Sequence, residues 1–161
     1  LRNGLILKLM QNLIRARLLS VLREENSLVY SPYISLFYNA VPDNIFYFDI
    51  NASVDRRNTA VVYACLQDII RELQDKKVSV KELNTLKQIF IVNKRNYLQN
   101  DATADWKTYL VGQLKNNESL ADLEQYETLL AGITPAEVRD AFRELVDADD
   151  YLLLSIGDFE L

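Results

Sequence analysis

The sequence predicts an α+β domain in which helices pack on one face of an antiparallel or mixed sheet. Three observations predict this class. Apolar residues recur with helical spacing over residues 5–24, alternate with a period of two over residues 45–53, and return to helical spacing after residue 55. Because the hairpin and the later helices are separate runs, the sheet and the helices form separate layers. The length of 161 residues suits a single domain.

The first predicted element is a helix over residues 5–24. Its apolar residues cover a broad face, so we expect burial over much of the helix surface. They are Leu5, Ile6, Leu9, Met10, Leu13, Ile14, Leu18, Val21 and Leu22. Asn26 and Ser27 then end the helix.

The second predicted element is an antiparallel hairpin with one apolar face. Residues 28–39 are rich in β-branched and aromatic side chains, and Pro42 lies in a turn at residues 41–44. Residues 45–53 alternate as a half-buried strand does. One face carries Phe46, Phe48, Ile50 and Ala52, and the other carries Tyr47, Asp49, Asn51 and Ser53.

From Asp55 onward the pattern is helical and is divided by capping sequences. Asp55 begins one helix, residues 79–82 form a capping box that begins another, and residues 102–115 form a third. A short helix opens at Ser119 and is closed by Gly132. The last begins at a second capping box, residues 134–137, with Pro135 at its first position and a staple between Ile133 and Val138.

Residues 151–156 predict a final strand. The segment is almost continuously apolar, so we expect a central position in the sheet. A central strand needs a neighbouring strand on each side, and the hairpin can supply a neighbour on one side only. The sequence therefore predicts a further strand from before Leu1.

Histidine is absent from the chain, and Cys65 is its single cysteine. This composition excludes most zinc sites, every Ser-His or Cys-His nucleophile pair and any disulfide framework. Cys65 lies in the middle of a helix on an apolar stripe, which predicts a core residue. A formal charge of −5 argues against a nucleic-acid partner. No run approaches the roughly 20 apolar residues of a membrane span.

Two further patterns have ordinary structural explanations. Residues 147–150 are rich in Asp, but a calcium loop starting there would need Gly where Leu152 stands and Glu where Asp158 stands, so a solvated turn is expected. The aromatic residues of the hairpin predict core and cross-strand packing rather than a platform for bases, although outward Tyr side chains suit hydrogen bonds to an extended peptide. No pair of carboxylates is singled out by its spacing.

Arg23 and Tyr30 are the remaining candidates for chemistry. Arg23 ends the first helix and Tyr30 begins the first strand, seven residues further on across a tight connection. Both side chains can converge on one spot and offer it a guanidinium fork and a phenol donor. From the sequence pattern alone, structural roles for both residues, with the Tyr30 ring packed in the fold, are favoured over a functional pair.

The order of several motifs adds to this interpretation. Residues 22–31 read Leu-Arg-Glu-x(4)-Val-Tyr-Ser after an apolar helix. Three further features come after it in the chain. They are a hairpin strand followed by a helix, a capped helix start at residues 78–83, and residues 132–138 followed by a strand ending at Gly157. In order and spacing, nearly the whole chain resembles the second-half domains of the pitrilysin/insulinase-like zinc metallopeptidases, the peptidases with an inverted HxxEH motif.

That resemblance implies a metallohydrolase-like, ferredoxin-type domain over residues 1–161, non-catalytic and lacking its first strand and helix. It implies that Arg23 and Tyr30 bind the peptide substrate and the oxyanion, and that no metal binds this chain. Zinc and HxxEH are expected in the N-terminal half of a parent hydrolase, so the chain alone is expected to be inactive. An exposed strand edge also predicts self-association. The alternative is a non-catalytic relative that acts as an assembly or peptide-binding subunit. The compartment, cytoplasm or periplasm, is left open.

Overall fold

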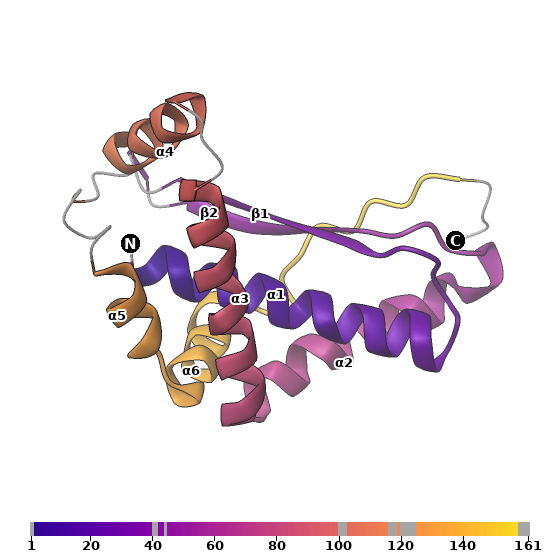
Figure 1. Cartoon of the computed structure of the whole chain (residues 1–161). Coiled ribbons are helices and arrows are strands. Elements are labelled where there is room, and N and C mark those ends of the chain that lie inside the picture. Colours follow the sequence, from indigo (N-terminus) through magenta and orange to yellow (C-terminus); the bar gives the residue numbers. More distant parts are fainter. Residues whose placement is uncertain are drawn as a thin grey trace.

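The computed structural model describes residues 2–39, 42–43, 45–99, 103–115, 119 and 125–157. These residues form a long N-terminal helix, a two-stranded hairpin and a group of further helices (Figure 1). The predicted α+β class is confirmed, with an antiparallel sheet. No helix within the described ranges is long and apolar enough to cross a membrane.

The N-terminal helix is the centre of the core. α1 (Arg2–Leu18) is continued by η1 (Leu19–Glu25), a turn of π-helix, so the predicted helix over residues 5–24 is confirmed and begins slightly earlier. Contacts with β1, α2, α3, α5 and α6 surround α1, which is why its apolar residues occupy more than one face. Its fully buried residues are Leu5, Leu9, Met10, Leu13, Ile14 and Leu18.

The hairpin packs one face on this core. β1 (Tyr33–Asn39) and β2 (Ile45–Asn51) are antiparallel, and Ile34 lies opposite Ile50. The Gln11 side chain of α1 donates a hydrogen bond of 3.1 Å to the Ile34 carbonyl, which ties helix and strand together. The residues that face the core are Ile34, Leu36, Tyr38, Phe46, Phe48 and Ile50. The predicted alternation is therefore confirmed over the seven residues of β2. The strand ends at Asn51 and not at residue 53, so Ala52, expected on the apolar face, lies outside it and is exposed.

The remaining helices follow the predicted order. They are η2 (Arg56–Asn58), α2 (Thr59–Asp75), α3 (Val80–Gln99), α4 (Thr103–Lys115), α5 (Tyr126–Ala131) and α6 (Pro135–Leu145). The box at Thr134 has both of its hydrogen bonds with Glu137, and Ile133 and Val138 are buried beside it. Ser79 accepts from the Glu82 amide at 3.1 Å, and Asp55 caps η2 rather than α2 itself.

Two elements of this region are described over shorter ranges than the sequence predicts. The short helix expected from Ser119 is described only as α5, from Tyr126, because residues 120–124 lie outside the described residues. The first strand begins at Tyr33 and not at residue 28, because Val29 makes only an isolated bridge with Val54.

The prediction of a central strand at residues 151–156 is wrong. The segment is not a strand, and the sheet formed by the described residues has two strands only. Leu152 is 95% exposed and Leu154 is 76% exposed. A strand exists only where another strand satisfies its backbone hydrogen bonds, and no described strand lies in a position to do so.

Candidate functional site

The connection between η1 and β1 places Arg23 and Tyr30. Leu22 and Val29 are buried, at 0% and 4% exposure, and each is followed directly by one of the two candidate residues. Because both anchors point into the core, Arg23 and Tyr30 emerge together on the outside. Val29 is held further by its isolated bridge to Val54, which lies three residues beyond the end of β2.

Backbone hydrogen bonds close this connection tightly. The Leu22 carbonyl accepts from the amides of Leu28 at 2.7 Å and Val29 at 3.2 Å, so residues six and seven positions apart meet. Ser27 makes the reversal with a φ of 52°, in the left-handed region that Ser seldom adopts. The Asn26 side chain donates to the Val21 carbonyl at 2.7 Å and satisfies a carbonyl at the helix end.

The two candidate side chains contact each other. The Arg23 guanidinium carbon lies 5.7 Å from the centre of the Tyr30 ring, within the range of a cation–π interaction. The Tyr30 side chain is otherwise open to solvent, because the residue is 84% exposed. The convergence proposed from the sequence is therefore present, whereas a packed Tyr, the ordinary structural alternative, is not what the structure contains.

Arg23 keeps its hydrogen-bond donors available. Among the described residues it has no ion pair and no side-chain hydrogen bond, although Glu24 and Glu25 follow it directly. The Glu25 carboxylate instead accepts from the Ser20 hydroxyl at 2.7 Å. A guanidinium with several free N–H groups beside a phenol O–H can bind a carbonyl oxygen or an oxyanion.

An exposed aromatic strip lies on the outer face of the hairpin, which follows Tyr30 in the chain. Phe37 and Tyr47 stack across the two strands, with ring centres 4.9 Å apart and an angle of 13° between the planes. Tyr33, on the same face, is 54% exposed. The cross-strand packing expected of these aromatic residues is confirmed, and Tyr33 and Tyr47 are both exposed.

Cys65 and the Asp-rich turn at residues 147–150 make contacts that explain them as parts of the fold. Cys65 is a free, half-buried thiol of α2 that packs against the core. In the turn at residues 147–150, Asp147 accepts from the Asp149 amide and Asp149 pairs with Arg71 at 2.9 Å. Both observations agree with the roles expected from the sequence.

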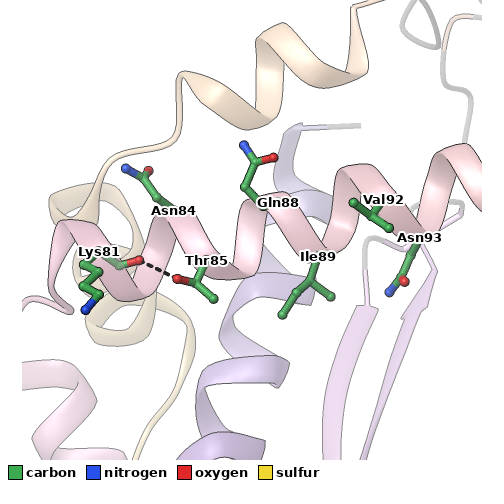
Figure 2. Close-up of a pocket in the computed structure, with 7 residues that line it drawn as sticks. All are labelled: Lys81, Asn84, Thr85, Gln88, Ile89, Val92 and Asn93. Atoms are coloured by element: carbon green, nitrogen blue, oxygen red, sulfur yellow. Dashed lines mark hydrogen bonds between the residues drawn. The ribbon is translucent and has the colours of Figure 1, made fainter.

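A shallow hollow lies on the surface of α3. Figure 2 shows that its lining side chains all project from successive turns of that single helix. Ile89 and Val92 are half exposed there, beside uncharged polar groups and one lysine. Because no second element closes the hollow and no charged pair faces it, we assign it no chemistry.

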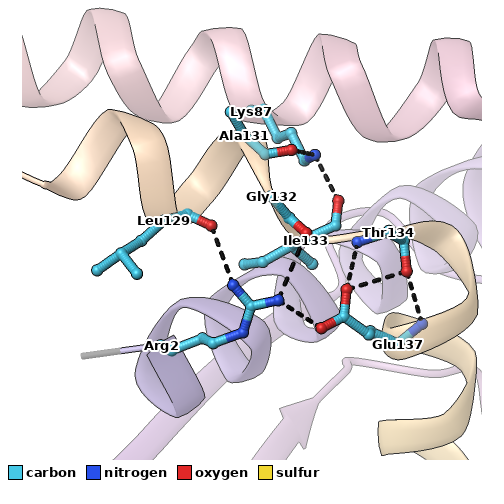
Figure 3. Close-up of polar contacts among 8 residues, drawn as sticks. All are labelled: Arg2, Lys87, Leu129, Ala131, Gly132, Ile133, Thr134 and Glu137. Atoms are coloured by element: carbon cyan, nitrogen blue, oxygen red, sulfur yellow. Dashed lines mark hydrogen bonds and ion pairs between the residues drawn. The ribbon is translucent and has the colours of Figure 1, made fainter.

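Sequence reasoning missed a charged cluster where α5 meets α6 (Figure 3). The buried Lys87 donates to the carbonyls of Ala131 at 2.8 Å and Ile133 at 2.5 Å. Burial lowers the pKa of Lys87, and the Glu137 carboxylate opposes that shift. Both carbonyls lie at or just beyond the end of α5, where helix carbonyls lack intrahelical donors. The one signal in the sequence was the spacing of Lys87, which follows the buried Leu83 by four residues in α3 and so lies on the same face of that helix.

Arg2 completes that cluster. Its guanidinium donates to the carbonyls of Leu129 at 3.5 Å and Gly132 at 3.4 Å, and it also pairs with Glu137. Hydrogen bonds from Arg2 and from the Thr134 amide hold the pKa of Glu137 below its ordinary value of 4.5. Every member of the cluster is bonded to another, so it is a structural cluster and not a site.

Comparison with known families matches residues 2–90 to the family described as the peptidase M16 inactive domain. The chain belongs to this family. The inactive domain includes α1, the hairpin and α2, together with Arg23 and Tyr30. No curated protein matches the chain.

Two solved structures share the fold of this inactive domain. One is the crystal structure of a peptidase M16 inactive domain from Pseudomonas fluorescens, with a TM-score of 0.76 and 19% identity over 91% of this chain and 35% of that one. The other is the periplasmic protease PqqL from Escherichia coli, with a TM-score of 0.74 and 19% identity over 89% of this chain and 16% of that one. The chain thus spans about a third and about a sixth of these two proteins.

Proposed function

We propose that this inactive domain is the C-terminal part of a zinc metallopeptidase and completes the chamber that holds the peptide substrate. Membership of the inactive-domain family supports a catalytic partner half. Without histidine, the chain does not fit a zinc site of the HxxEH kind, so zinc would be held by that partner half, where it would activate water.

The observation that carries the proposal is the exposed pair of Arg23 and Tyr30. Peptide cleavage places negative charge on the former carbonyl oxygen, and donors aimed at that oxygen lower the barrier. Arg23 supplies a guanidinium that has no ion pair among the described residues, and Tyr30, which is 84% exposed, supplies a phenol. The guanidinium carbon lies 5.7 Å from the centre of the Tyr30 ring. The stacking contact orients Arg23 without occupying its N–H groups. Neither donor has to transfer a proton to act.

The exposed aromatic strip supports a peptide as the ligand. Tyr33 and Tyr47 each combine an apolar ring with a hydroxyl, which suits contact with the alternating apolar and polar groups of an extended chain. Under this proposal the strip faces the chamber and the core face of the hairpin stays against α1.

Substitution in the full-length enzyme tests the proposal. Arg23→Ala and Tyr30→Phe are expected to lower kcat/KM for a fluorogenic peptide by about 100-fold each, the usual effect of losing an oxyanion donor. Zinc content and the melting temperature should stay unchanged. Arg95→Ala and Tyr151→Phe are matched controls, because Arg95 pairs with Glu127 on α3 and Tyr151 lies against Tyr63 of α2. Normal turnover in both test variants would reject the assignment.

The second candidate is a non-catalytic assembly or peptide-binding subunit, which the aromatic strip also favours because binding on it needs no zinc. Under this alternative, the complete polypeptide has no HxxEH motif and does not cleave peptides. Tyr47→Ala would then weaken peptide binding, and Arg23→Ala would affect no reaction. Finding HxxEH together with cleavage excludes it.

A further inference from the structure

Three exposed cations follow one face of α1 and η1 and end at the pair of Arg23 and Tyr30. They are Lys8, Arg15 and Arg23, here called the basic line. Their spacings of seven and eight residues are each about two helical turns, so the side chains lie on the same face of the helical unit. At a rise of 1.5 Å per residue, Arg15 lies at most about 12 Å from Arg23 along the axis, and Lys8 at most about 22 Å.

The charges of the basic line are not neutralised within the described part of the chain. None of its three side chains forms an ion pair or a hydrogen bond with another described residue. The strand β1, which packs on α1, has no acidic residue. The one acidic residue of α3, Glu82, is already bonded to Arg17. Likewise the one acidic residue of α5, Glu127, is bonded to Arg95. A chain with a formal charge of −5 therefore keeps a row of positive charges open to a ligand.

We propose that the basic line binds an acidic segment of the peptide substrate and guides it to the pair of Arg23 and Tyr30. This inference rests on the proposed function, which places the cleaved peptide bond at that pair. An extended peptide advances about 3.4 Å per residue. Substrate residues three or four positions from the cleaved bond would then lie beside Arg15, and those six or seven positions away beside Lys8. Glutamate or aspartate at these positions suits both cations.

The geometry favours an acidic peptide over other anionic partners. A nucleic-acid strand carries one negative charge per about 3.4 Å, so cations about 10 Å apart would leave most of its phosphates without a partner. A membrane surface needs apolar side chains beside the cations, whereas the large apolar residues of α1 are buried in the core. Glu24 and Glu25 lie beside Arg23, where the substrate presents its cleaved peptide bond and needs no acidic side chain.

Two fluorogenic peptides test this inference in the full-length enzyme. Both are built on a peptide whose cleaved bond has been mapped, and each is made with the test positions on the amino or on the carboxyl side of that bond. One carries Glu at the third, fourth, sixth and seventh positions, and the other carries Gln there. We expect kcat/KM for the Glu peptide to be about fivefold higher on one side of the bond, through a lower KM, and the difference to shrink as salt is added.

Charge reversal at the basic line should remove this preference. The test variant combines Lys8→Glu with Arg15→Glu, and the matched control combines Lys77→Glu with Lys107→Glu, two exposed lysines outside the basic line. Both double variants change the net charge equally and should keep the melting temperature of the parent, because the substituted side chains are exposed. The control should keep the preference for Glu. Equal cleavage of both peptides by the parent, or equal loss of the preference in both variants, overturns the proposal.

A binding measurement separates this inference from the proposed function. Fluorescence anisotropy with the same peptides, labelled, measures their binding to the full-length protein even where it cleaves neither. Tighter binding of the Glu peptide that only the test variant loses, together with normal turnover in Arg23→Ala and Tyr30→Phe, would reject the oxyanion role and retain the basic line. Equal binding of the Glu and Gln peptides, with turnover lowered in Arg23→Ala, would reject the basic line and retain the proposed function.

Discussion

Two arginines at opposite ends of the same helical unit have opposite uses. Arg2, at the start of α1, donates to two carbonyls and pairs with Glu137. The guanidinium of Arg23, in the last turn of η1, has one interaction among the described residues, with the Tyr30 ring. The comparison shows that a saturated guanidinium joins elements of the fold, whereas an unsaturated one is available to a ligand.

The physical reason lies in what surrounds each residue. Arg2 lies where α5 ends and α6 begins, and backbone carbonyls there need donors that the helices do not supply. Arg23 lies where the chain closes its own hydrogen bonds, through the Leu22 and Arg23 carbonyls and the Asn26 side chain. These carbonyls therefore do not depend on the Arg23 guanidinium, and its donors remain open.

The largest effect on stability is expected at the Arg2 end, from Lys87→Met. This change keeps the length of the side chain and removes both donors to the carbonyls of Ala131 and Ile133. Leaving buried carbonyls without partners should lower the free energy of unfolding by about 2 kcal/mol. Urea denaturation followed by circular dichroism measures it, and a loss below about 0.5 kcal/mol would contradict the role given to Lys87.

Arg2→Ala against Arg23→Ala tests the comparison most directly. Arg2→Ala should cost about 1 kcal/mol, a value kept low because its side chain is 39% exposed and solvent screens the pair with Glu137. Arg23→Ala should change the free energy of unfolding by less than about 0.5 kcal/mol, as substitutions of open surface residues do. The same urea titrations decide the matter, and equal losses in the two variants would remove the distinction.

A smaller effect is expected from pH. Because the folded pKa of Glu137 lies below its ordinary value of 4.5, the unfolded chain binds more protons as the pH falls through this range. The stability from this carboxylate is therefore present above about pH 4.5 and is lost as the pH falls through the lower, folded pKa. Glu137→Gln should be less stable than the parent at pH 7 and should lose less stability between pH 5 and pH 3.

The control for this experiment is Asp140→Asn, an exposed carboxylate bonded to its neighbour Arg139. The slope of stability against pH should fall more in Glu137→Gln than in this variant. Equal slopes in both would show that the link to Arg2 contributes no pH-dependent stability.

Local features of this fold were predictable from sequence because neighbouring residues determine them. The box at Thr134 depends on a side chain three residues away, and the inner face of β2 depends on alternation alone. The meeting of Arg23 and Tyr30 was also within reach, because the tight connection joins two buried anchors, Leu22 and Val29. The exposure of Tyr30 was not predictable, since the local sequence favoured a packed Tyr side chain.

Tertiary contacts alone determine the cluster around Arg2 and whether residues 151–156 pair as a strand. The contact of Arg2 with Glu137 joins residues 135 positions apart, and nothing local to either residue indicates it. Residues 151–156 have the composition of a strand, but pairing requires a second strand, and composition does not say whether one is near. The sequence by itself determined the capped helices, the two faces of the hairpin and the lack of imidazole chemistry. Only the tertiary structure decided which arginine is saturated and which apolar segment is left unpaired, because both depend on contacts between distant parts of the chain.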